Sequence, residues 1–239
     1  GKFVERTEKL IEEIKRRRTL QKTESALLKI AELANSKISL NAFYFETHRL
    51  ISTLIYAENL YVVLKCDKAQ CLEFVYYSDS LDDMSMDEMK LLNSDINKSL
   101  TGLLFRRNEA LLLSSEEIRA LAKQGKIIRR GPETISWLGI PLRIDEETIG
   151  VIVLQSYLKE KRFGDKDIQL MEYVAKSVAN AIQRKSGQTE LEALIDKRTL
   201  ALKQSNLELT HQIEEKTKAE KLQNALYEIA NLTSDAEEL

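Results

Sequence analysis

The sequence has few of the residues that interrupt regular structure or build covalent and metal frameworks. Its 239 residues include two prolines, eight glycines, two cysteines and two histidines. So little proline and glycine predicts helices and strands joined by few long loops. Two cysteines and two histidines are too few for a disulfide framework or a structural metal site. No apolar run reaches the roughly 20 residues that span a bilayer, and no signal-peptide segment precedes the first residues. We therefore expect a cytoplasmic chain without membrane contact and without a metal or cofactor.

Neither sign of charge is in excess. Charged residues make up 31% of the chain, and 36 basic against 38 acidic side chains leave a formal net charge of -2. This balance argues against nucleic acid or a membrane surface as the main partner. The run Arg16-Arg17-Arg18 follows Glu12 and Glu13, so we interpret it as part of a solvated helix face.

Hydrophobic periodicity divides the chain into helical and strand-like segments. A charged stretch without glycine or proline predicts one long helix, and two β-rich pairs of runs predict two hairpins. Separate hairpins and helices indicate an α+β fold with an antiparallel sheet. The apolar run 149–154 indicates a central strand covered on both faces. The expected helices are 3–35, 40–56, 97–107, 115–123 with a Ser114–Glu117 capping box, and 165–182; the expected strands are 60–66, 72–77, 110–113, 136–144 and 148–157.

Two of these segments resemble a known family. Residues 137–142 read WLGIPL and residues 149–157 read IGVIVLQSY, which is similar to the signature hairpin of GAF domains from bacterial signalling proteins. The likeness covers about residues 25–184. It implies a GAF-like antiparallel sheet with flanking helices, and a sensory role. Further agreement lies at 57–62, 100–102, 111–113, Phe163, Asp167, Val174, Ala175, Val178, Ala181 and Ile182.

The segment after this region has a coiled-coil pattern. Ile195, Leu202 and Leu209 recur every seven residues at position d, with Thr199, Asn206 and Ile213 at position a. Leucine at d and one asparagine at a favour a parallel two-stranded coil. The runs 195–200, 206–209, 213–215 and 218–220 also resemble the linkers that join sensor domains to bacterial output domains. We expect a homodimer held by the long N- and C-terminal helices; the alternative is an amphipathic helix that folds back on its own domain.

The end of the chain repeats its beginning. At an offset of 199 positions, residues 12–40 contain eight identities without a gap, where unrelated sequence would give roughly two. We therefore expect a fragment with an N-terminal signalling helix (1–24), a GAF domain (25–184), a coiled-coil connector (185–222) and the truncated start of a second GAF-like domain (223–239). The identical pairs are Ile14/Ile213, Lys22/Lys221, Ala26/Ala225, Leu27/Leu226, Ile30/Ile229, Ala31/Ala230, Leu33/Leu232 and Leu40/Leu239.

The reactive side chains give no catalytic arrangement. Cys66 and Cys71 flank the turn of the first hairpin, and we interpret them as thiols in a reducing cytosol. Relatives that reduce free methionine sulfoxide use a further cysteine that this chain lacks. His48 is expected to be packed or solvated, and His211 is expected on the surface of the coil. The cyclic-nucleotide motif and the bilin-attaching Cys-His pair of other GAF domains are absent.

One group of side chains could line a pocket between the sheet and the segments that cross it. It combines aromatic walls with a few polar groups, as a small-molecule site requires. A half-exposed sheet face would look the same, and this alternative stays open. The residues are Tyr76, Tyr77, Thr101, Trp137, Gln155 and Tyr157.

The leading hypothesis is a dimeric sensory or signal-relay module, itself not an enzyme, from a larger bacterial protein. The resemblance implies an output domain of the GGDEF diguanylate cyclase type or a histidine kinase. Two alternatives are a thiol-based enzyme like a methionine sulfoxide reductase, centred on Cys66 and Cys71, and a dimerisation spacer without a ligand. The sequence names neither the ligand nor the output domain.

Overall fold

The computed structural model describes residues 2–66, 72–81, 98–129 and 131–237. The chain divides into two units, Gly1–Lys185 and Ser186–Leu239, which are described separately. The helices are α1 (Lys2–Asn35), α2 (Leu40–Ile51), α4 (Leu100–Arg107), α5 (Ser115–Lys123) and α6 (Asp165–Glu237); the strands are β1 (Asn59–Lys65), β2 (Leu72–Ser78), β3 (Leu111–Ser114), β4 (Ser136–Ile144) and β5 (Glu147–Ser156).

The strands form one antiparallel sheet in the order β2-β1-β5-β4-β3. This confirms the predicted α+β fold. Strand β5 pairs with β1 on one side and β4 on the other, and residues 151–154 are buried. The prediction of a central strand covered on both faces is therefore confirmed, and its apolar character follows from having no solvent-exposed side.

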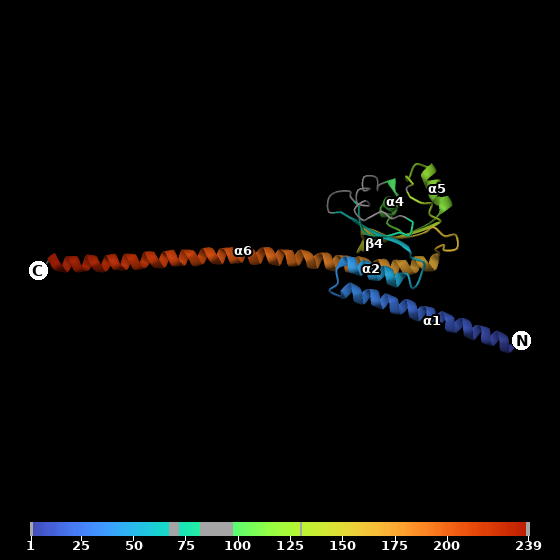
Figure 1. The fold of residues 1–239 in the computed structure, drawn as a ribbon, viewed down its shortest axis with the longest axis horizontal. Helices are drawn as coiled ribbons and strands as arrows, with labels where there is room; N and C mark the ends of the chain where they lie inside the picture. The colour runs from blue at the N-terminus through green and yellow to red at the C-terminus, as the bar shows by residue number, and fades with distance from the viewer. Residues whose placement is uncertain (1, 67–71, 82–97, 130, 238–239) are drawn as a thin grey trace. The chain divides into compact units, whose positions relative to one another are not determined.

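Each face of the sheet carries its own hydrophobic core. One face, here called the helix face, is covered by α2 and the first part of α6, with α1 outside them (Figure 1). Residues Leu60, Val62, Ile152 and Leu154 point to this side. The other face, here called the α4 face, lies under α4 and α5 and buries Tyr61, Val63, Val151 and Val153, among others. Alternation along β1 and along residues 151–154 of β5 separates the two sets.

Two helix ends show how local chemistry sets the boundaries. Ser114 accepts a hydrogen bond from the Glu117 amide, and the Glu117 carboxylate accepts one from the Ser114 amide, so the predicted capping box is confirmed. Helix α2 ends at Ile51, five residues before its predicted end at Tyr56. Here the Ser52 hydroxyl donates to the His48 carbonyl, and the Thr53 hydroxyl donates to the Leu50 carbonyl. The backbone changes at the same point: the Thr53 and Leu54 amides bond to the carbonyls of Leu50 and Ile51, three residues back, so the last turn tightens where the helix ends.

The last helix is one continuous element. Instead of a domain helix followed by a separate connector, α6 runs for 73 residues. In the first unit it buries Met171, Val174, Val178 and Ile182 in the helix-face core. No helix in the described part of the chain combines the length and the apolar character that crossing a membrane requires.

Lys185 is the last residue of the first unit and lies within α6. The Lys185 ammonium donates to the carbonyl of Ser36 over 2.8 Å and to the carbonyl of Ile38 over 2.5 Å. Both acceptors lie in the short link between α1 and α2. A cation there satisfies carbonyls that follow a helix C-terminus, where the helix dipole favours positive charge. Lys185 therefore ties α6 to the end of α1.

Candidate functional site

The structure brings together five of the six predicted pocket residues. Tyr77 and the buried Trp137 belong to the α4-face core. The buried Thr101 lies in the first turn of α4, and Gln155 pairs with Trp137 in the ladder between β4 and β5. Tyr157 follows β5 and is bonded to Gln155. These five side chains gather on the α4 face.

Tyr76, the sixth residue, lies on the helix face. Val62 faces Tyr76 across the ladder and Val63 faces Phe74, so Val75 is an extra residue at a β-bulge. Val75 and Tyr76 both pack on the helix-face core, while Phe74 and Tyr77 pack on the α4-face core. Regular alternation from Phe74 would place Tyr76 on the α4 face, and the bulge turns it away. The structure therefore does not bring Tyr76 together with the other five.

A carboxylate that the sequence analysis did not select joins two of the five residues. The Tyr157 hydroxyl donates to Asp79 Oδ2 over 2.6 Å, and the Gln155 amide donates to the same oxygen over 2.8 Å. The Gln155 amide also lies 2.9 Å from the Tyr157 hydroxyl oxygen. Asp79 follows directly after β2 and is 76 or more residues from both partners. No periodic pattern in the sequence links positions that far apart.

A buried asparagine holds the backbone beside this carboxylate. Asn59 is fully buried; its side-chain amide donates to the Gln155 carbonyl over 3.0 Å, and its carbonyl oxygen accepts from the Ser80 amide over 2.7 Å. Both ends of the side chain are therefore used. Because Asn59 is bonded to β5 and to the residue after Asp79, it fixes where Asp79 stands relative to Gln155.

A tyrosine occupies the floor of the site. The hydroxyl oxygen of Tyr61 lies 3.0 Å from that of Thr101. Burial raises the pKa of Tyr61 and the charge of Asp79 raises it further, while hydrogen bonds to Thr101 and Trp137 act in the opposite direction. Tyr61 thus remains a neutral phenol at physiological pH.

The ring of Trp137 needs a glycine beneath it. A Cβ at Gly139 would lie 2.5 Å from Leu104 Cδ2 and 2.6 Å from the Trp137 ring. Only glycine leaves room at this position of β4 for both the indole ring and the Leu104 side chain of α4. This explains in physical terms why the WLG run in the sequence places an aromatic wall in this site.

The rings of Tyr61, Phe74 and Tyr77 complete the wall. Their centroids lie 5.5 Å apart for Tyr61 and Phe74, 6.4 Å for Tyr61 and Tyr77, and 6.3 Å for Phe74 and Tyr77. An aromatic wall beside a carboxylate, an amide and two phenols suits recognition of a small polar molecule. Among the described residues no three His, Cys, Asp or Glu side chains are placed to hold a metal ion.

His48 lies on the other face and has a structural setting. Its Nδ1 is 2.8 Å from the Tyr76 hydroxyl, and its Nε2 faces the Ala57 carbonyl. A carbonyl only accepts, so Nε2 carries the proton and Nδ1 accepts from Tyr76. Burial lowers the pKa of His48, and the bond to Ala57 partly offsets this. His48 is packed, which is one of the two states expected for it.

Comparison with known proteins decides the family. A model of the GAF domain matches residues 40–182, more than half of the chain. The chain belongs to the GAF domain family. The predicted resemblance is therefore confirmed. A comparison with curated protein sequences gives no match.

Solved structures with the same fold include GAF domains and an enzyme. The GAF domain of a phosphoenolpyruvate-protein phosphotransferase from Coxiella burnetii has a TM-score of 0.58 at 16% identity, covering 71% of this chain and 98% of that one. The GAF domain of the Acinetobacter phosphotransferase gives 0.54 at 16%, covering 68% and 93%. Free methionine-R-sulfoxide reductase from Neisseria meningitidis, in complex with its substrate, gives 0.53 at 14%, covering 69% and 91%. At these identities the likeness shows the fold alone.

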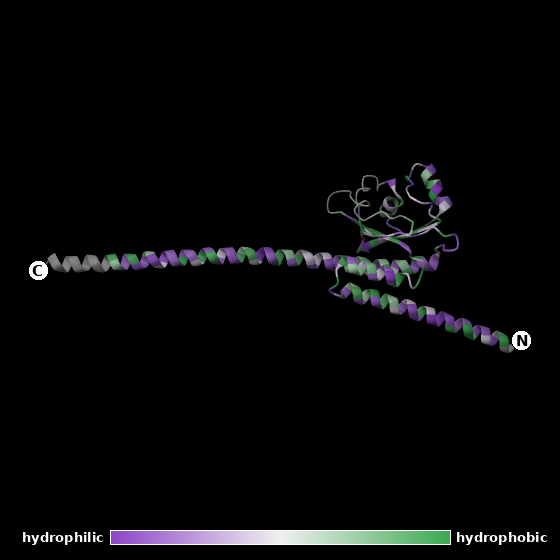
Figure 2. Cartoon of the chain, viewed as in Figure 1, coloured by the Kyte–Doolittle hydropathy of each residue, from purple (hydrophilic) through white to green (hydrophobic). Residues whose placement is uncertain are grey.

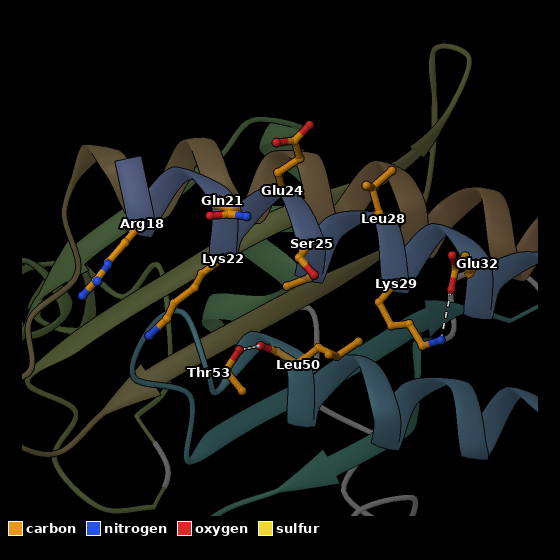
Figure 3. Close-up of a pocket in the computed structure, with 11 residues that line it drawn as sticks. Arg18, Gln21, Lys22, Glu24, Ser25, Leu28, Lys29, Glu32, Leu50 and Thr53 are labelled. Atoms are coloured by element: carbon orange, nitrogen blue, oxygen red, sulfur yellow. Dashed lines mark hydrogen bonds and ion pairs between the residues drawn. The ribbon is translucent and has the colours of Figure 1, made fainter. Parts of the chain in front are cut away.

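The first unit also has an open groove between α1 and the C-terminal end of α2, which the sequence analysis did not anticipate (Figure 3). Leu50 and Thr53 form one wall, and residues of α1 between Arg18 and Glu32 form the other. Lys29 and Glu32 pair across 3.0 Å in this wall. The mixture of cationic and anionic side chains gives the groove no single charge.

Cys66 differs from its expected state. Cys66 is disulfide-bonded in the structure, where a free thiol was expected. Cys71 lies outside the described residues, and so does the turn that the two cysteines were predicted to flank. Cys66 follows β1 and is not among the residues of the α4-face site.

Proposed function

We propose that this GAF domain is the sensory module of a larger bacterial signalling protein, in which a small molecule on the α4 face regulates an output domain through a dimeric coiled coil. One observation carries the proposal. Helix α6 contributes Met171, Val174 and Val178 to the core of the domain and continues as one helix to Glu237. A helix that is part of both the domain and the connector is a direct mechanical path between them.

The input side rests on the group on the α4 face. Tyr61, Thr101 and Trp137 form its buried part, and Asp79, Gln155 and Tyr157 form its half-buried polar part. Fixed donors and acceptors beside aromatic rings distinguish a recognition surface from an ordinary sheet face. The ligand we propose is a small polar molecule with hydrogen-bond donors that reach the Asp79 carboxylate.

The connector rests on the apolar residues of the second unit. Ile195, Leu202, Leu209 and Ile213 are all exposed, and apolar residues recur among polar ones along this part of α6 (Figure 2). Isolated helices bury such a stripe against a partner. We propose a second copy in parallel register, because the a-position Asn206 is then placed opposite its equivalent and each can bond the other.

The output side follows from the linker pattern of residues 195–220. We propose a diguanylate cyclase of the GGDEF type, or else a histidine kinase, as the regulated domain. Lys185 gives the domain a means of acting on the connector, since its two bonds to the link between α1 and α2 hold α6 where it leaves the first unit.

The dimer is tested by changing the proposed seam. Leu202→Asp with Leu209→Asp should give monomers by multi-angle light scattering, because four charges would then face each other in the coil. The matched control carries Lys197→Asp and Gln204→Asp, which lie at outer f positions, and should remain dimeric. Dimers of the seam variant would show that another surface holds the copies together.

The sensory role is tested by a thermal-shift screen of nucleotides, amino acids and other metabolites. A true ligand should raise the Tm of the parent, and the shift should disappear in Asp79→Ala. If no compound shifts the Tm, the domain is a spacer rather than a sensor. Turnover of free methionine sulfoxide, run in parallel with a thiol reductant, is expected to be absent, and its presence would make the protein an enzyme.

A further inference from the structure

The part of α1 that packs on the domain recurs near the C-terminal end of the chain. Between residues 26 and 33, five positions are identical to those 199 residues later. Three positions differ: Leu28, Lys29 and Glu32 become Tyr227, Glu228 and Asn231. The identical pairs are Ala26/Ala225, Leu27/Leu226, Ile30/Ile229, Ala31/Ala230 and Leu33/Leu232.

Burial in α1 separates the two sets completely. Ala26 and Ile30 are buried, and Leu27, Ala31 and Leu33 are half-buried. The three positions that differ are all exposed: Leu28 has 61% of its surface exposed, whereas the identical Ile30 has 0%. A similarity due only to helix-forming composition would fall on both sides of the helix. The repeat instead preserves the side that contacts a domain.

One buried position next to this segment is not identical in the repeat, but both of its residues are small. The buried Ala34 corresponds to Thr233, which is also small. Outside the contact region the agreement falls: between residues 12 and 25 only Ile14 and Lys22 recur, and both are exposed in α1. The repeated unit is therefore the docking segment of α1, not the whole helix.

The first residues of the second copy are exposed to solvent in this chain. Ala225 and Leu226 are exposed, Leu226 to 58%, while the matching Ala26 is buried. We propose that residues 225–232 are the docking helix of a second GAF-type domain that follows in the same polypeptide. That domain covers Ala225 and Ile229 as the first domain covers Ala26 and Ile30.

The first domain defines the chemistry of this partner. Ile30 belongs to a core with Phe43, Ile51 and Val178, so the partner must present an apolar groove between two helices that accepts one isoleucine side chain. In α1 the exposed charged pair Lys29–Glu32 lies outside this apolar contact. The inference does not depend on a ligand, because it concerns the far end of the connector.

Hydrogen–deuterium exchange tests the proposal on two proteins: the 239-residue chain and the full polypeptide encoded by the gene. Amides 225–232 should exchange about tenfold or more slowly in the full polypeptide, since docking protects them. Amides 206–213, in the middle of the connector, should exchange equally in both. A reading frame that ends directly after Leu239, or equal exchange of 225–232 in the two proteins, would overturn the proposal. Protection of 225–232 already in the 239-residue chain would overturn it as well, because the segment would then dock on this domain or on a second copy.

A matched pair of variants in the full polypeptide locates the contact. Ile229→Asp changes the residue that corresponds to the buried Ile30 of α1 and should abolish the protection. Glu228→Lys changes the residue that corresponds to the exposed Lys29 and introduces the same lysine, so protection should persist. Loss of protection in both variants, or in neither, would contradict the assignment of the docking side.

Discussion

The helix face and the α4 face of the sheet both bury hydroxyl groups, but the hydrogen bonding of these groups differs between the two faces. On the helix face the fully buried Tyr44 and Thr47 hydroxyls have no hydrogen-bond partner among the described residues, and the bonded hydroxyl there is that of the half-buried Tyr76, which donates to His48. On the α4 face the Tyr61 hydroxyl meets Thr101, and the half-buried Tyr157 donates to Asp79. An apolar core tolerates an unbonded hydroxyl at some cost to stability. A surface that recognises ligands requires polar groups fixed in direction, which is what the α4 face has.

The largest effect is expected from a core residue of the helix face. Phe43→Ala removes a side chain that is 0% exposed and should lower the free energy of unfolding by about 3–5 kcal/mol. Phe45→Ala on the same helix removes a ring that is 59% exposed and should change it by about 0.5 kcal/mol or less. Urea unfolding followed by circular dichroism measures both. Similar losses for the two variants would show that α2 buries a different side.

Two tyrosine-to-phenylalanine changes compare the hydroxyls directly. Tyr61→Phe leaves the Thr101 hydroxyl without its partner and should cost about 1–3 kcal/mol. Tyr44→Phe removes an unbonded hydroxyl and should be neutral or stabilising by about 1 kcal/mol. The same urea titration reports both values. A destabilised Tyr44→Phe would show that this hydroxyl has a partner, such as a buried water.

The polar network of the α4 face should show coupling. Asp79→Ala and Tyr157→Phe should each cost about 1 kcal/mol, because each removes the 2.6 Å bond between phenol and carboxylate and both groups are half-buried. The double variant should cost less than the sum, by about 0.5 kcal/mol or more. A double-mutant cycle measures this coupling. Additive costs would mean that the bond contributes nothing to folding.

The smallest effect is a pH dependence on the helix face. Burial lowers the pKa of His48 in the folded state, so the unfolded chain takes up the proton first. Stability from this group is complete above the unfolded pKa of about 6.5 and falls as the pH drops below it. Between pH 8 and pH 5 the parent should therefore lose more stability than His48→Gln. His211→Gln, at the only other histidine and an exposed one, should lose as much as the parent.

Much of the fold was predictable because short-range signals set it. Strand 136–144, helix 115–123 and the start of the last helix at Asp165 agree with the structure. Each depends on neighbours in sequence: strand alternation, a capping box, an acidic first turn. The end of α2 was predicted too late because the apolar stripe continues past Ile51, while the backbone tightens to bonds between residues three apart at Thr53 and Leu54.

The candidate site was less predictable, because it depends on contacts between distant residues. Trp137 and Gln155 were found through the hairpin pattern, which also sets their pairing. Asp79 was missed, since nothing near it in the sequence marks a carboxylate that meets Tyr157. Tyr76 was included because a β-bulge has no sequence signature of its own. Whether any of these residues binds a ligand stays a prediction.

The bulge at Val75 changes which residues of strand β2, odd-numbered or even-numbered, face the α4 side of the sheet. Before it, the even-numbered Leu72 and Phe74 belong to the α4-face core, and after it the odd-numbered Tyr77 does. The next odd position is Asp79. In a regular strand with Phe74 on the α4 face, residue 79 would lie on the helix face, so the bulge brings this carboxylate to the site. The strand thus carries one spare residue. Loss of Val75 would give a regular ladder in which Phe74, Tyr76, Tyr77 and Asp79 keep their present sides, so this strand can shorten by one residue at that point without exchanging its two faces.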